Sequence, residues 1–133
     1  DLTSRVREHM RKQYHFRPSP DGFYAWDVDR LVQLSGPLAL QAVGLEQIAE
    51  LDEAYWFSAG NIPSCRSIAE HFKLMMAADL QYPIILCAEG RLMDGMHRVT
   101  KALAHGEQTI LSVRFDQTPE PDFTDIQPHD LPY

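Results

Sequence analysis

The chain has 133 residues, of which 44% are hydrophobic and 23% charged, and its formal net charge is −7. These values are typical of a globular domain with its own core and exclude an intrinsically disordered chain. No apolar run approaches the ~20 residues that span a bilayer. We therefore expect no membrane segment. Cys65 and Cys87 form no disulfide or metal-binding motif, so we expect the protein to lie in the reducing cytoplasm.

Charge is distributed unevenly along the chain. The first 17 residues are basic, whereas residues 116–133 are acidic, contain four prolines and have no Lys or Arg. A nucleic-acid-binding domain usually presents a broad basic face, so one short basic arm argues against nucleic acid as the main partner. We expect residues 116–133 to form an irregular acidic tail.

The first half of the chain is predicted to be rich in helices. A four-residue apolar spacing predicts a helix over 4–14, which the turn residues of 17–22 end. Asp27 is a typical N-cap for a second helix, which Gly36-Pro37 would stop. The next segments are predicted to be a strand over 38–43, a short helix over 45–53 and a loop over 54–63 that contains Tyr55-Trp56-Phe57.

The clearest helix follows this loop. Ser67 and Glu70 have the spacing of a capping box at its start. Apolar residues at i, i+4, i+7 and i+8 predict one continuous stripe facing the core, formed by Ile68, Phe72, Met75 and Met76. His71 would lie on the side away from Met75.

The second half predicts a small sheet. Residues 83–88 have the pattern of a central strand buried on both faces, and residues 91–93 can return antiparallel after a turn at Glu89-Gly90. Asp94-Gly95 then opens a helix that ends at Gly106, with Met96, Val99 and Leu103 toward the core, and 109–115 is the last strand. This order predicts an α+β (mixed α/β) fold, a small mixed sheet flanked by helices. We expect one domain over 1–115, with its core at 40–115 and a helical part at 1–37.

The start of the helix after Asp94-Gly95 carries the most informative residues. The first N–H groups of a helix lack intrahelical partners and carry partial positive charge, so this is a favourable place for an anion. Gly95 lets a ligand approach the backbone closely, and His97, Arg98 and Lys101 add donors. A structural interpretation stays open, in which Asp94 is an N-cap, Arg98 pairs with a carboxylate and Lys101 is solvated.

Residues 82–86 and 90–98, followed by Ala102 and Gly106, resemble the ParB/sulfiredoxin-like superfamily, whose members share a stretch P-I-x-V … G … (D/G)-G-x-(H/R)-R … A … G. The resemblance covers roughly residues 40–115. It implies a ParB/sulfiredoxin-like fold with a phosphate-binding pocket formed by Gly95, Met96, His97, Arg98 and Lys101. It also implies that the helix before the central strand borders the pocket, so Glu70 and His71 on that helix could face a ligand.

Two departures from the family narrow the function. Sulfiredoxins have a catalytic Cys immediately before the His-Arg pair, where this chain has Met96, and a thioether cannot act as that nucleophile. Partition proteins of the family have Gly-Glu-Arg-Arg at this point, whereas residues 94–98 of this chain are Asp-Gly-Met-His-Arg. We therefore expect neither sulfinic-acid reduction nor chromosome partitioning.

The sequence thus favours a protein that binds a phosphorylated small molecule, such as ATP or another nucleotide with Mg²⁺. Whether it is an enzyme stays open; if so, phosphoryl transfer or hydrolysis is the natural chemistry, with Asp94, Glu70 and His71 as candidates for the catalytic base or metal ligand. The six histidines show no zinc-binding spacing, so no dedicated metal site is predicted. Two alternatives remain, a non-catalytic protein-interaction, self-associating or nucleotide-sensing module, and a DNA-associated protein or nuclease that uses the arm 5–17.

Overall fold

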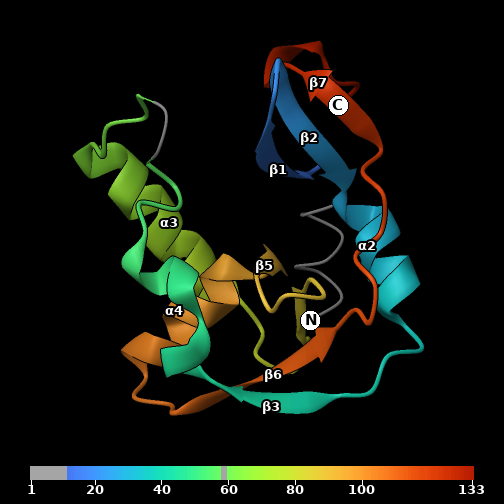
Figure 1. Cartoon of the computed structure of the whole chain (residues 1–133). Helices are drawn as coiled ribbons and strands as arrows, with labels where there is room; N and C mark the ends of the chain where they lie inside the picture. Colours follow the sequence, from blue (N-terminus) through green and yellow to red (C-terminus); the bar gives the residue numbers. More distant parts are fainter. Residues whose placement is uncertain (1–11, 58–59) are drawn as a thin grey trace.

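The computed structural model describes residues 12–57 and 60–133, which form an α+β fold with two β-sheets (Figure 1). The α+β class predicted from the sequence is confirmed. The predicted helix over 4–14 lies mostly outside the described residues, and Tyr14, at its expected end, belongs to a strand. Within the described residues, no helix is long and apolar enough to cross a membrane.

One sheet is antiparallel, with the order β1-β2-β7. Its strands are β1 (Tyr14–Ser19), β2 (Gly22–Asp27) and β7 (Phe123–Ile126). The turn residues within 17–22 were expected only to end a helix. In the structure they connect β1 to β2 in a β-hairpin. Residues 116–133 are not simply an irregular tail, because β7 pairs with β2 and Leu131 is buried. The Asp125 carboxylate accepts hydrogen bonds from the Ser19 hydroxyl and the Asp21 N–H, which ties this segment to the hairpin turn.

The second sheet is mixed and has the order β3-β6-β4-β5. Its central pair, β4 and β6, is parallel, and both outer pairs are antiparallel. Its strands are β3 (Gln41–Gly44), β4 (Ile84–Leu86), β5 (Leu92–Asp94) and β6 (Thr109–Arg114). The predicted central strand and its antiparallel return are therefore confirmed.

This mixed sheet is buried on both faces. Ile84 and Leu86 pack with Val99 of helix α4 (Met96–Ala104) in one core cluster. Ile85, between them, points to the opposite face and packs in a second cluster with Trp26 of β2. Because side chains alternate along a strand, three consecutive apolar residues can supply two cores.

The first two described helices begin at short polar caps. Helix α2 (Val28–Ser35) begins as predicted, with the Asp27 carboxylate accepting from the Asp29 N–H at 2.9 Å. The capping box of helix α3 (Cys65–Ala77) lies three residues earlier than predicted, since Ser64 and Ser67 exchange hydrogen bonds of 3.0 and 2.9 Å. Glu70 therefore has no capping role, because the Ser67 hydroxyl already accepts the hydrogen bond from the Ser64 N–H.

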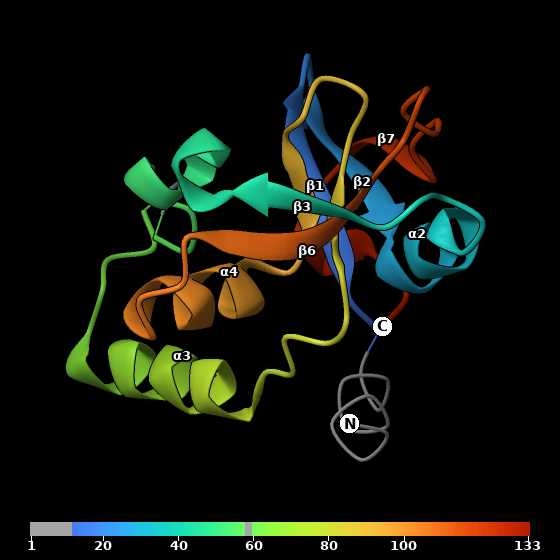
Figure 2. The same ribbon diagram turned by 90° about the horizontal axis from the view of Figure 1, so that it is seen from below.

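The predicted inward stripe of α3 is wrong. Ile68, Phe72 and Met76 are 54%, 57% and 63% exposed, and only Met75 of the four is half-buried. Helix α3 lies beside α4 rather than against the sheet (Figure 2). The side of α3 that contains His71 faces α4. The more apolar side of α3 therefore stays exposed to solvent.

Two smaller expectations about helices also differ from the structure. In α4, Met96 and Val99 are buried as predicted, but Leu103 is 53% exposed and Ala102 takes the core position. Ala102 has the smaller side chain, which suits close packing of α4 on the sheet. Residues 45–53 form two short 3-10 turns, η1 (Leu45–Gln47) and η2 (Ala49–Asp52), instead of one helix.

Candidate functional site

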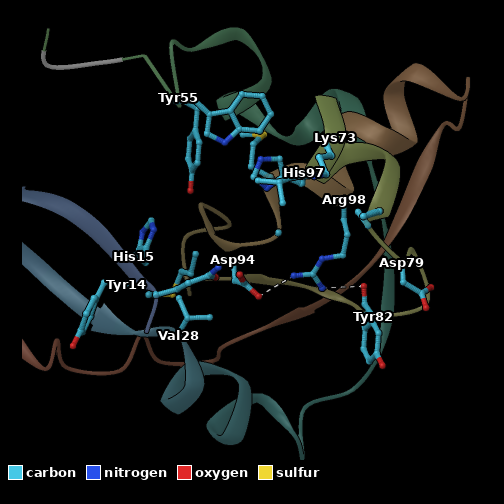
Figure 3. A pocket seen from close by; sticks show the side chains of 18 residues that line it. Tyr14, His15, Val28, Tyr55, Lys73, Asp79, Tyr82, Asp94, His97 and Arg98 are labelled. Carbon is cyan, nitrogen blue, oxygen red and sulfur yellow. Dashed lines mark hydrogen bonds and ion pairs between the residues drawn. The ribbon is translucent and has the colours of Figure 1, made fainter. Parts of the chain in front are cut away.

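A cleft of about 540 Å³ lies where the predicted site was expected (Figure 3). Residues 93–98, at the end of β5 and the first turn of α4, form part of its wall. Tyr14 and His15 of β1 come from the other sheet, and Tyr55 and Trp56 come from the loop before α3. The cleft therefore joins segments that are far apart in the sequence, and its volume is in the range that holds small molecules.

The turn from β5 into α4 depends on Gly95. This residue has φ +116°, in the left-handed region that disfavours side chains. A Cβ here would also lie 2.7 Å from Cγ2 of Ile84. In the described part of the chain, the N–H groups of Met96, His97 and Arg98 meet no acceptor, so the first turn of α4 presents unpaired donors and the positive end of the helix dipole at the cleft.

The predicted anion-binding cations make contacts within the protein. The Arg98 guanidinium donates to Asp94 Oδ2 at 2.9 Å and to the carbonyl oxygens of Tyr82 and Pro83 at 3.1 and 2.7 Å. The Arg98 and Asp94 side chains are only 12% and 17% exposed. Lys101 donates to the carbonyl oxygens of Met76 and Ala78 at the end of α3. In this structure both cations join α4 to neighbouring segments. Arg98 pairs with a carboxylate, as its structural interpretation requires, whereas Lys101 is half-buried instead of solvated and does not line the cleft.

His71 and His97 meet beside the cleft, under the ring of Trp56. Nδ1 of His71 and Nε2 of His97 are 2.9 Å apart, a hydrogen-bonding distance. The Trp56 ring stacks on His71 at 4.0 Å and on His97 at 4.7 Å, with interplanar angles of 13° and 20°. The sequence placed His71 on the wrong side of α3 relative to Met75, but the expectation that it could border the site agrees with this contact.

Two histidines and one tyrosine of this region are held neutral. Burial, with smaller effects of His71 and Arg98, lowers the pKa of His97 to about 4, and burial also lowers the pKa of His71. Burial, together with the nearby carboxylates of Glu50 and Asp94, raises the pKa of Tyr55 to about 12. At neutral pH the wall therefore offers uncharged imidazoles and a phenol that can donate a hydrogen bond.

Lys73 is a lining residue that sequence reasoning missed. It comes from α3, is exposed, and makes no ion pair with the described residues. In Figure 3 its side chain lies at the same end of the cleft as His97. Its spacing of four residues from Ala77, which also lines the cleft, would have been a signal only once the position of α3 was known. Glu70, by contrast, is exposed and does not line the cleft.

No family model, curated protein or solved structure matches the chain. The site therefore has to be interpreted from its own geometry. The described residues contain no group of three or more His, Cys, Asp or Glu side chains that could hold a metal ion.

His15, on the β1 side of the cleft, makes the fold sensitive to acid. It is 9% exposed, and its Nε2 accepts a hydrogen bond from Arg17 Nε at 3.0 Å. Burial, then the charges of Arg17 and Arg91, lowers its pKa from 6.5 to about 3. The unfolded chain thus binds more protons at His15 between these two values, so the contribution of His15 to stability is fully present above pH 6.5 and is lost as the pH falls toward 3.

We expect the free energy of unfolding to fall by about 2 kcal/mol from pH 7 to pH 5 through His15 alone. His15→Gln should remove much of this dependence, because the amide can still accept from Arg17 and does not titrate. Urea titrations of both proteins at pH 7, 6 and 5 measure the difference. Equal pH dependence in the two proteins would show that His15 is not the group responsible.

Proposed function

We propose that the cleft binds a small phosphorylated molecule, such as a nucleotide, with a phosphate at the first turn of α4. The observation that carries the proposal is that Met96, His97 and Arg98, whose N–H groups meet no acceptor among the described residues, line a cleft of ligand size. Helix N-termini bind phosphate through these donors and the helix dipole.

The charges and surfaces around this turn support the same ligand class. Lys73 can supply the mobile cation that Arg98 and Lys101 cannot supply without leaving their partners. Leu74, Ala77 and Tyr82 add an apolar wall suited to the organic part of the ligand. The ParB/sulfiredoxin-like resemblance also implies phosphate at this turn, and we propose that relationship on residues 82–86, 90–98, 102 and 106.

Calorimetric titration tests the proposal with ATP, ADP, CTP and inorganic phosphate, each with and without Mg²⁺. Lys73→Ala should weaken binding about tenfold or more, since a hydrogen bond to a charged group contributes about 1.5–3 kcal/mol. Arg66→Ala is the matched control, because it removes the same charge from an exposed position of α3 outside the cleft. No binding by the wild type, or equal losses in the two variants, would contradict the proposal.

A second candidate is a module that binds a protein partner, or a second copy of the chain, without catalysis. The exposed apolar residues of α3 and the loop before it favour it, namely Ile62, Ile68, Phe72 and Met76. Ile68, Phe72 and Met76 follow one another at intervals of four residues along α3, and exposed apolar side chains that gather on one face mark interaction sites. Turnover of a bound nucleotide would count against a purely non-catalytic role.

Nothing in the described residues adds support to a DNA-associated role. Of the basic arm, Lys12 pairs with Asp27 at 3.0 Å and Arg17 donates to His15. Residues 5–11 lie outside the described part of the chain. Cys65 and Cys87 are both free thiols, which fits the reducing cytoplasm that we propose as the location.

A further inference from the structure

The hydrogen bond between His71 and His97 leaves one ring nitrogen of His97 for the cleft. His97 lines the cleft and His71 does not. Because Nε2 of His97 is engaged by His71, the nitrogen that remains for a bound molecule is Nδ1. The chemical role of the cleft therefore depends on whether Nδ1 carries a proton.

Two neutral imidazoles can share this bond in two ways. If His97 donates from Nε2, both rings have their proton on Nε2, the more stable tautomer of neutral imidazole, and Nδ1 of His97 has a free lone pair. If His71 donates, both rings must adopt the less stable Nδ1–H form. The pairing of Nδ1 with Nε2 thus favours a proton acceptor at the cleft.

The ring of His97 is also held in place. Trp56 stacks on both imidazoles, and His71 fixes one edge of His97. Lys73 from α3, Asp94 from β5, Arg98 from α4 and Tyr55 from the loop complete the polar surroundings. Burial and the two nearby basic groups keep His97 unprotonated to about pH 5, since its pKa is about 4. A fixed, neutral imidazole can take up a proton as a general base, and a phosphate anion bound beside it would raise its pKa from about 4 toward the working pH.

We propose that the cleft hydrolyses the phosphate ester or anhydride that it binds, with His97 as the general base and His71 as the residue that positions it. The inference rests on the proposed function. A water oxygen attacks phosphorus, its proton passes to Nδ1 of His97, and the bond from phosphorus to the leaving oxygen breaks. The leaving oxygen keeps that electron pair and takes a proton from solvent.

The tautomer can be measured without any ligand. Long-range ¹H–¹⁵N correlation of the histidine rings in the wild-type protein at pH 7 reports which nitrogens carry protons. We expect a protonated Nε2 and an unprotonated Nδ1 for His97. The reverse assignment would overturn the inference, because Nδ1 would then be a donor to an anion and not a base.

Phosphate release from p-nitrophenyl phosphate and from ATP, with and without Mg²⁺, tests the reaction. His97→Asn should lower kcat about 100-fold or more, as expected for loss of a general base. His71→Leu should lower kcat with little change in KM, whereas His71→Asn should retain most activity because its amide oxygen can still accept from Nε2 of His97. His105→Ala, an exposed histidine after the same helix, is the control and should match the wild type.

Binding and turnover separate the two proposals. A wild type that binds these probes but releases no phosphate would overturn hydrolysis and leave the binding site in place. A wild type that binds none of them would overturn both. Equal activities of His71→Leu and His71→Asn would remove the positioning role of His71.

Discussion

Arg98→Ala should lower the free energy of unfolding by about 3 kcal/mol, because breaking a largely buried ion pair leaves a charge and polar groups without partners. The guanidinium bridges Asp94 and the two carbonyl oxygens of Tyr82 and Pro83. Its loss therefore detaches the first turn of α4 from the segment that leads into β4. Urea denaturation, with an unchanged m-value, measures the effect.

The same variant distinguishes the two interpretations of Arg98 that the sequence leaves open. Arg66→Ala serves as the control, since Arg66 is exposed at the start of α3. A stable Arg98→Ala protein with greatly weakened nucleotide binding would mean that the guanidinium leaves its partners to bind the ligand. A destabilised protein that still binds would assign Arg98 to the framework of the site.

A double-mutant cycle with Asp94 sharpens this prediction. Asp94→Ala alone leaves Arg98 without its carboxylate partner, so it should also destabilise the fold. Removing both side chains should cost less than the sum of the single changes, because no unpaired charge remains in the cleft wall. Additive effects would show that the contact at 2.9 Å contributes little.

Gly95→Ala should destabilise the protein by about 2–4 kcal/mol, combining the cost of a positive φ with that of overpacking. The added Cβ would lie 2.7 Å from Ile84 Cγ2, and Ile84 is fully buried in the sheet. The turn would have to shift, and the N–H groups of α4 would shift with it. Thermal or urea unfolding gives the magnitude, and calorimetry of the folded variant shows whether phosphate binding is lost.

Gly106→Ala separates the two costs. Gly106 also has a positive φ, +78°, but a Cβ there would meet nothing within 4 Å. Its replacement should therefore cost only about 1 kcal/mol, the penalty for the backbone conformation. If the two variants were equally destabilised, the contact with Ile84 would not explain the requirement for glycine at Gly95.

The predictions that the structure confirms rest on local signals. The apolar run at β4, the Glu89-Gly90 turn and the Asp94-Gly95 helix start each depend on neighbours within a few residues. Asp27 as an N-cap is of the same kind. Such patterns fix backbone conformation through hydrogen bonds and sterics that operate within one or two turns of chain.

The predictions that differ concern which surface an element meets. The apolar spacing of α3 could not show that the helix packs on α4 through His71 and leaves Phe72 exposed. The acidic composition of 116–133 could not show that β7 would pair with the edge of β2. Both outcomes depend on partners far away in the sequence, and propensity carries no information about them.

For the site, the sequence by itself determined the first turn of α4, since Asp94-Gly95 after an apolar strand predicts a helix start and the first N–H groups of a helix lack intrahelical partners. Only the tertiary structure decided what surrounds that turn. In the folded protein, Arg98 and Lys101 donate hydrogen bonds to carbonyl and carboxylate oxygens. The packing of α3 and of the loop before it also places His71 and Trp56 against His97. Side chains take whichever partners the packed fold brings within about 3 Å, and this proximity is set by the packing of whole elements.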